Sequence, residues 1–315
     1  MEHLLFSLNA TIPIFLIMVL GYILKQCKMM DESFVKTLNS LNYKFTLPVL
    51  LFRDIASSDF AKVWDTKYVV FCFSATLISI VVLWILVHLF YKDRNQQGEF
   101  IQGAYRSSAA VLGIAFIQNI YGDSGMAPLM IIATVPLYNV AAVLVLSFTG
   151  PNGGKLNKEK FSKSCLDILH NPILWGIFLG MLASGLQISL PVILSKPIDQ
   201  IAALATPLAL IGLGGGFEGA KALRKIAPTL VCSAIKLLVL PALFLPFAIS
   251  LGFTEQKLAA ILIMLGAPTT VSCYIMAKNM GHDGTLTSST VVATTFFSSV
   301  TMTMWLYICK SMGYL

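Results

Sequence analysis

The sequence predicts an all-α polytopic membrane protein whose ten transmembrane helices form two inverted five-helix repeats. Three observations carry this prediction: the composition, a series of ten long apolar windows, and an internal repeat at an offset of 159 positions. The 315-residue chain is 57% hydrophobic and only 12% charged, whereas a soluble domain has about 25% charged residues. So few charges cannot cover a soluble surface, and the lipid bilayer is therefore the expected partner. The formal net charge of +7 is interpreted as a topology signal, and no nucleic-acid partner is expected.

Each apolar window is long enough to cross a bilayer, which takes about 20 mostly apolar residues in a helix. The first window has neither the basic start nor the small-residue cleavage pattern of a signal peptide, so it is interpreted as a retained span. The runs are continuous and do not alternate, which disfavours the strands of an outer-membrane barrel. The windows cover residues 6–25, 34–55, 67–91, 101–121, 126–148, 171–188, 198–217, 226–251, 257–279 and 285–308.

Lysine and arginine gather in one set of alternate loops, and this asymmetry predicts the orientation of the chain. The richer set is expected to face the cytoplasm, so that both termini lie outside the cytoplasmic (inner) membrane. The richer loops hold Lys25, Lys28, Lys36, Lys92, Arg94, Lys155, Lys158, Lys160, Lys163, Lys221, Arg224, Lys225 and Lys278. The opposite loops hold Arg53, Lys62, Lys67, Lys196, Lys257 and Lys310.

Helix-breaking and charged residues recur at the same offset in both halves of the chain. The matching pairs are Pro13 and Pro172, Gly21 and Gly180, Pro48 and Pro207, Lys62 and Lys221, and Gly122 and Gly281. A polar stretch separates the halves, so we expect a first repeat over 1–149, a cytoplasmic linker over 150–170 and a second repeat over 171–315. Because each half has five spans, the second half must enter the membrane from the opposite side. Inverted repeats of this kind are typical of secondary transporters.

The ninth window carries a proline inside an apolar helix, followed by hydroxyl side chains. Pro268 removes one helical hydrogen bond, and the freed backbone groups must face protein or a water-filled cavity because lipid offers them no partner. The equivalent fourth window is again small and hydroxylated. Interrupted helices at matching positions of inverted halves are expected to cross near the midplane, where half-helix N-termini attract an anion. The candidate binding residues are Arg106, Ser107, Ser108 and Gly113 in the fourth window, and Pro268, Thr269, Thr270 and Ser272 in the ninth.

Three cations lie inside the predicted spans, whereas all fifteen Asp and Glu residues lie in loops or near span ends. Lys236, near the middle of the eighth span, is a further candidate for the binding site because intramembrane ionisable residues are costly and mark function. Arg106 could instead reach the interface by snorkelling, and Lys44 in the second span is ambiguous. Embedded positive charge without buried carboxylates favours an anionic substrate such as a carboxylate, and it leaves the coupling ion open.

No motif indicates an enzyme, a metal site or a bound cofactor. The pattern Gly214-x-Gly216-x-x-Gly219 follows no strand, so it is interpreted as close helix packing or a helix end, and not as a dinucleotide site. The six cysteines have no CxxC spacing, and free thiols within helices are expected.

Five stretches together resemble the auxin efflux carrier family, in particular its bacterial members described as permeases for malate, malonate and similar acids. The stretches are "FTLPVLLF", "FIQGAYRSSAAVLG", "IKLLVLPALF", "APTTVSCYIMAKNMG" and "SSTVVATTFFSSVTM". The resemblance covers nearly the whole chain. The chain departs from the family pattern in the fourth window, where Ser107 and Ser108 replace the usual asparagine and Ala115 replaces a proline.

The resemblance implies a scaffold of helices 1, 2, 6 and 7, often dimeric, and a transport domain of helices 3–5 and 8–10. Helices 4 and 9 of that fold are broken and cross beside the substrate. It implies a permease or efflux carrier that moves a small organic anion, such as malate or malonate, by an elevator-like alternating-access mechanism. Two alternatives stay open: a carrier of auxin-like indole acids, and a non-transporting ligand-binding membrane receptor with the same fold.

Overall fold

The computed structural model describes residues 13, 16–57, 64–109, 117, 120–121, 126–149, 166, 170–188, 190–217 and 224–315. Within these residues every named element is a helix, which confirms the predicted all-α architecture. The first helix is Leu16–Gln26. The elements that follow are α2 (Glu32–Leu41), η1 (Asn42–Thr46), α3 (Leu47–Ala56), α5 (Thr66–Phe90), α6 (Arg94–Tyr105), α8 (Ala127–Thr149), α10 (Pro172–Gly185), α11 (Val192–Gly215), α13 (Ile226–Ala234), η3 (Ile235–Val239), α14 (Leu240–Ser250), α15 (Glu255–Gly266), α16 (Ser272–Asn279) and α17 (Thr285–Ser311). The elements η1 and η3 are short π-helical segments inside longer helices.

Within the described residues, five helices are long and apolar enough to cross a membrane: α5, most of α8, α11, the run from α13 to α14, and α17. Two apolar helices are shorter, namely Leu16–Gln26 and α10. Helical segments lie in all ten predicted windows. The inverted ten-span arrangement itself stays a prediction. Most of the predicted linker over 150–170 lies outside the described residues.

Two helices, α6 and α11, begin at least a full turn before their apolar windows. The helix α6 begins at Arg94 and not at 101, because the Asp93 carboxylate accepts a hydrogen bond from the Asn95 amide at 3.1 Å and caps it. Its first turn is polar, so a hydropathy window cannot detect it. The helix α11 begins at Val192 and not at 198, and it includes Pro197 near its start.

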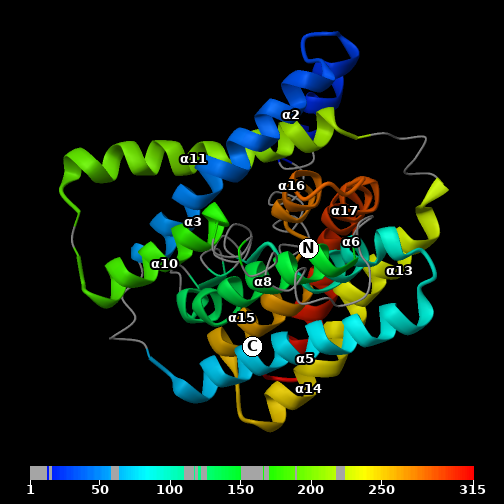
Figure 1. Ribbon diagram of the computed structural model, residues 1–315. Helices are drawn as coiled ribbons and strands as arrows, with labels where there is room; N and C mark the ends of the chain where they lie inside the picture. Colours follow the sequence, from blue (N-terminus) through cyan, green and yellow to red (C-terminus); the bar gives the residue numbers. More distant parts are fainter. Residues whose placement is uncertain are drawn as a thin grey trace.

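The helices pack as two groups with a shared boundary. The first helix group comprises α2, η1, α3, α10 and α11, and the second comprises α5, α6, α8, α13, η3, α14, α15 and α17. Figure 1 shows α2, α3, α10 and α11 on one side of the molecule, with α5, α13 and α14 on the other. The short helix α16 contacts both groups, since it packs on α2, η1 and α11 as well as on α6, α8 and α17.

Glycines allow the helix Leu16–Gln26 and the helices of the first group to approach closely. A Cβ added at Gly21 would lie 2.3 Å from the carbonyl oxygen of Ile211, and one added at Gly180 would lie 3.0 Å from that of Phe52. Gly21 and Gly180 are separated by the same 159 positions as Phe52 and Ile211. The two contacts are therefore equivalent under the predicted repeat.

The end of α11 packs closely at Gly214 and Gly216, the first two glycines of the G-x-G-x-x-G pattern, whereas Gly219 lies outside the described residues. A Cβ added at Gly214 would lie 1.9 Å from the carbonyl oxygen of Met18. A Cβ added at Gly216 would lie 1.9 Å from the hydroxyl oxygen of Tyr274 on α16. These glycines leave room for a neighbouring backbone and for a tyrosine.

Glu99 is a buried acid that the apolar windows placed outside the fourth span. It lies inside α6 and is 1% exposed. Its carboxylate accepts hydrogen bonds from the backbone amides of Gly284 at 2.9 Å and Thr287 at 3.0 Å, and from the Thr287 hydroxyl at 3.0 Å. A negative charge is stabilised at a helix N-terminus, so the first turn of α17 compensates for the burial. The result is a charged link between α6 and α17.

Candidate functional site

Two helices end where the sequence predicted interruptions. The helix α15 ends at Gly266, the backbone is extended at Ala267, and α16 begins at Ser272. The helix α6 ends at Tyr105, and Arg106 is extended. Pro268 lies in the gap between α15 and α16, because its ring and missing amide oppose a continuous helix there.

The two interruptions meet and satisfy one another's backbone groups. Ser107 and Thr269 form an isolated antiparallel bridge, and the Ser108 amide donates to the Pro268 carbonyl at 2.9 Å. The Thr269 hydroxyl donates to the Gly103 carbonyl at 2.7 Å. Buried backbone groups need such partners, so this pairing stabilises the broken segments without lipid or water. We call these paired segments, residues 106–108 and 267–271, the crossing.

Lys236, on η3, donates hydrogen bonds to the crossing and to the two helix ends beside it. It is fully buried, and its ammonium donates to the carbonyl oxygens of Leu265 at 2.6 Å, Met264 at 3.4 Å and Tyr105 at 3.4 Å. It also donates to the Ser107 hydroxyl, which in turn donates to the Met264 carbonyl. These carbonyls belong to the C-terminal ends of α6 and α15, where the helix dipoles are negative. The charge of Lys236 is thus matched by two helix ends.

Arg106 occupies a different environment, beside the N-terminus of α16. It is 2% exposed, and its Nη2 donates to the Asn139 side-chain oxygen and to the Ser272 hydroxyl, both at 3.0 Å. Its Nη1 contacts the Met276 sulfur at 2.9 Å. Among the described residues its Nε is buried without a hydrogen-bond partner.

No carboxylate neutralises the guanidinium within the part of the chain that the structure describes. The ion pairs there are Lys25 with Glu32, Arg53 with Asp54, Lys225 with Asp283, and Lys257 with Asp65. A buried charge without a counterion is costly unless it is paired or hydrogen-bonded. Neutral acceptors hold Arg106 in place and leave its charge available to an anion.

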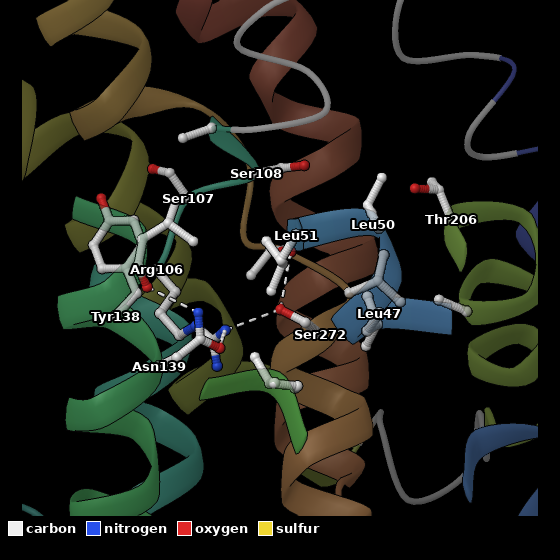
Figure 2. Close-up of a pocket in the computed structure, with 16 residues that line it drawn as sticks. Leu47, Leu50, Leu51, Arg106, Ser107, Ser108, Tyr138, Asn139, Thr206 and Ser272 are labelled. Atoms are coloured by element: carbon white, nitrogen blue, oxygen red, sulfur yellow. Dashed lines mark hydrogen bonds between the residues drawn. The ribbon is translucent and has the colours of Figure 1, made fainter. Parts of the chain in front are cut away.

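A cavity of about 80 Å³ opens at this guanidinium, between the two helix groups. Figure 2 shows Arg106, Asn139 and Ser272 facing one another on one side, with Leu50 and Thr206 across the space. One ordered water needs roughly 10–15 Å³ measured in this way, so the cavity suits a molecule of a few heavy atoms. It is lined by Leu47, Leu50, Leu51, Arg106, Ser107, Ser108, Ala109, Val135, Tyr138, Asn139, Ile173, Thr206, Ala209, Thr270, Val271 and Ser272.

The predicted site residues divide into lining and supporting positions. Arg106, Ser107, Ser108, Thr270 and Ser272 line the cavity. Three other residues lie elsewhere: Pro268, Thr269 and Lys236 belong to the crossing or contact it, outside the lining set. Gly113 lies outside the described residues. Lys44, the third cation expected inside a span, is exposed on η1 and does not line the cavity.

Asn139 lines the cavity but is not among the candidate binding residues that the sequence predicted. It lies on α8 and is 2% exposed. Its amide nitrogen donates to the Val135 carbonyl at 2.8 Å, which turns its oxygen toward Arg106. The signal was a lone amide in an otherwise apolar span, but its partner could not be identified without the packing of α8 against the crossing.

The lining has the chemistry of an anion receptor. It combines one guanidinium, the N-terminus of α16 at Ser272, whose dipole is positive, and the serine and threonine side chains of Ser107, Ser108, Thr206, Thr270 and Ser272. None of the lining residues named above is acidic. Within the described residues, no group of three or more His, Cys, Asp or Glu side chains is placed to hold a metal ion.

Comparison with known proteins identifies the family. A family model described as "Membrane transport protein" matches residues 6–306, which confirms the family indicated by the resemblance to auxin efflux carriers. The chain is 23% identical to an uncharacterized transporter of Escherichia coli (strain K12), over 98% of this chain and 99% of that protein. It is 20% identical to an uncharacterized transporter of Methanothermobacter thermautotrophicus, over 95% and 97%. It is 22% identical to a protein of Rhizobium meliloti named "Putative malonate transporter", over 95% of each chain. The chain belongs to the membrane transport protein family.

Proposed function

We propose that this membrane transporter is a secondary carrier of a small organic anion, a carboxylate such as malonate or malate, and that Arg106 binds the carboxylate. The observation that carries the proposal is a buried guanidinium, open to a small cavity and without a carboxylate partner among the described residues. A carboxylate cargo would supply the missing counterion through charge-assisted hydrogen bonds. The name of the Rhizobium relative supports the same class of cargo.

We further propose that the first helix group, with Leu16–Gln26, is the scaffold and that the second group, with α16, is the moving transport domain. The cavity between the groups supports this division, because sliding one group would carry a ligand held at Arg106 while the leucine-rich face of α3 stays behind. The matching glycine contacts at one sequence offset support inverted repeats. In this account the scaffold forms a homodimer and both termini face the outside of the cytoplasmic membrane.

Uptake into proteoliposomes tests the cargo and the site together. Labelled malonate, malate and an indole acid are offered to the wild-type protein, with an imposed proton or sodium gradient in separate arms. We expect saturable uptake of a short carboxylate and poor uptake of the indole acid, since the cavity is small. Arg106→Gln should lower the initial rate by about tenfold or more, because a hydrogen bond to a charged group contributes about 1.5–3 kcal/mol.

The matched control is Lys196→Gln, which removes an exposed cation near the start of α11 and should leave uptake unchanged. Uptake by Arg106→Gln at the wild-type rate would contradict the site. Specific binding of a carboxylate without flux in any gradient would favour the receptor alternative.

A further inference from the structure

A second cavity, of about 440 Å³, lies near the far end of α16 from the Arg106 pocket. Its walls come from α2, from the helix Leu16–Gln26, from Gly216 at the end of α11, and from the C-terminal part of α16. The helix α16 has 8 residues, so its two ends are about 12 Å apart at 1.5 Å per residue. One short helix thus borders both cavities, with Ser272 at the first and Asn279 at the second.

Positive charge dominates this second cavity. Among the described residues three lysines line it, namely Lys25, Lys36 and Lys278, against a single acid, Glu32. Glu32 is 91% exposed and lies 3.9 Å from Lys25, so solvent screens most of its effect. Among the described residues neither Lys36 nor Lys278 has a carboxylate partner.

The amine of Lys278 is held by a neutral group, which keeps its charge available. Its Nζ donates to the main-chain carbonyl of Asp283 at 3.1 Å. The Asp283 carboxylate pairs instead with Lys225, at 3.3 Å. The aliphatic part of Lys278 rests on Gly284, where an added Cβ would lie 2.6 Å from its Cδ.

Neutral polar groups complete the wall between the lysines. Asn39 is 4% exposed and lines the cavity, and its side-chain oxygen lies against Gly212 of α11, where an added Cβ would be 2.2 Å from it. Tyr274 is 1% exposed and is seated against Gly216. Asn279 anchors its amide on the Ile275 carbonyl at 2.8 Å. The buried side chains of Asn39 and Tyr274 distinguish this cavity from a solvated surface that merely carries scattered lysines.

We propose that this cavity is a second anion-binding site, built for a small anion with two or more negative charges, such as a dicarboxylate or a phosphate group. Two ammonium groups without a carboxylate partner in the described part of the chain, and a third that is shared with one exposed acid, match a multivalent anion better than a single carboxylate. A concave basic wall concentrates anions from solution. A role as an antechamber that delivers cargo to Arg106 rests on the proposed function, but anion binding itself does not.

Calorimetric titration of the full chain in neutral-lipid nanodiscs tests this site, with malonate and inorganic phosphate as the probes. The Arg106→Gln background removes the first pocket, so any saturable binding that persists reports on the second. We expect Arg106→Gln to retain binding that weakens at high salt. Adding Lys36→Gln and Lys278→Gln should weaken it by about tenfold or more, since a basic residue near an anionic surface contributes on the order of a factor of five. Both lysines are exposed, so these variants should fold.

The control pair is Lys196→Gln with Lys310→Gln, which removes the same charge from exposed positions outside the cavity and should leave binding unchanged. A parallel arm in nanodiscs with anionic lipid identifies the source of the anion. Competition by that lipid, dependent on Lys36 and Lys278, would support an anion site filled by a lipid headgroup. Absence of binding in the Arg106→Gln background, or equal binding with and without the two lysines, would overturn the site. Loss of carboxylate uptake with retained binding here would refute the proposed cargo and leave this site standing.

Discussion

At the scale of single residues, the two buried cations Arg106, which belongs to the crossing, and Lys236, which contacts it, have different surroundings. Lys236 donates to main-chain carbonyls at the ends of two helices, whereas Arg106 is held by side chains and borders the cavity. That both are cations inside predicted spans gives no hint of this difference. It follows from which atoms surround each charge: negative helix ends in one case, neutral acceptors and an open space in the other.

Asn139 should control how well Arg106 is positioned. Asn139→Asp places a carboxylate against the guanidinium, so the internal ion pair should compete with cargo and abolish uptake. Asn139→Ala removes one hydrogen bond to a charged group, which corresponds to about 1.5–3 kcal/mol and should raise the KM of uptake by roughly tenfold or more. Initial rates over a range of carboxylate concentrations measure both effects. Wild-type kinetics in Asn139→Asp would refute the account of Arg106 as the anion receptor.

Lys236 should matter for stability as well as for transport. Lys236→Met leaves the carbonyls of Tyr105, Met264 and Leu265 without this donor in a buried place, and an unsatisfied buried polar group costs about 1–3 kcal/mol. We expect a lower melting temperature and little uptake. Arg106→Gln should lose less stability, since glutamine can still bond to neighbouring side chains. Thermal unfolding in detergent compares the two, and equal melting temperatures for Lys236→Met and the wild type would contradict a supporting role.

Residue types in the sequence were sufficient to find most of the candidate site, but not to distinguish the residues that line the cavity from those that support it. Arg106, Ser272 and Pro268 follow from a proline, hydroxyls and a cation in matching windows. Whether a polar residue faces the cavity depends on the rotation of its helix and on a partner more than a hundred positions away. Thr269 illustrates this, because its hydroxyl donates to the Gly103 carbonyl on α6 and does not face the cavity.

At the scale of elements, interrupted and closely packed helices set the shape of the site. The π-helical segment η3 carries Lys236, and π-helical turns often mark functional positions. The helix α10 approaches α3 through glycines, and Ile173 of α10 lies on the cavity wall with Leu47 of α3. The packing of these two helices therefore fixes one side of the pocket.

Gly176 should be intolerant of even one added carbon. A Cβ at this position would lie 2.3 Å from the Pro48 carbonyl oxygen, so Gly176→Ala must push α10 away from α3. Forced overpacking costs about 1–3 kcal/mol, and the melting temperature should fall. Gly185→Ala, on the same helix, meets nothing within 4 Å and should leave it unchanged. Equal melting temperatures for the two variants would contradict close packing at Gly176.

The start of α5 carries an ion pair whose contribution to stability depends on pH. The Asp65 carboxylate accepts from the Lys257 amine at 2.5 Å and from the Tyr68 amide at 3.0 Å. The hydrogen bond from Lys257, followed by that from the Tyr68 amide, lowers the pKa of Asp65 below its ordinary value. A carboxyl group with a lower pKa in the folded state stabilises the fold above its unfolded pKa of about 3.9. That contribution is lost as the pH falls through the folded pKa.

Asp65→Asn should reduce the loss of stability that occurs as the pH falls, while the asparagine side chain can still cap the helix. At neutral pH the loss should stay below about 1 kcal/mol, because exposed ion pairs contribute little. Melting temperatures recorded from neutral pH down to about pH 3 provide the measurement. Lys257→Gln removes the other partner of the ion pair and should likewise reduce the fall in melting temperature at acidic pH. If the melting temperature of both variants falls with pH as steeply as that of the wild type, this ion pair is not the source of the pH dependence.

At the scale of the whole molecule, the sequence predicted the helical class and the positions of helical segments in ten windows, because long apolar runs are a strong signal. It could not predict where α6 begins, since the first turn of that helix is polar. It also could not predict that Glu99 is buried, because the groups that stabilise its carboxylate belong to the start of α17, far away in the sequence. The two-group packing also depends on contacts between helices far apart in the sequence. The equivalent contacts of Gly21 and Gly180 nevertheless occur at the offset that the sequence pattern contains.

The central claim is that the carboxylate of the cargo binds the guanidinium of Arg106, and an internuclear distance tests it most directly. Solid-state NMR on ¹⁵N-arginine-labelled protein in lipid, saturated with ¹³C-carboxyl-labelled malonate or the best-transported acid, measures the nitrogen-to-carbon dipolar coupling. We expect a separation under about 4 Å, as in a charge-assisted pair, and its loss in Arg106→Lys, where Arg53, Arg94 and Arg224 remain. An unchanged coupling in Arg106→Lys, or none in wild-type protein that transports the acid, would contradict the account.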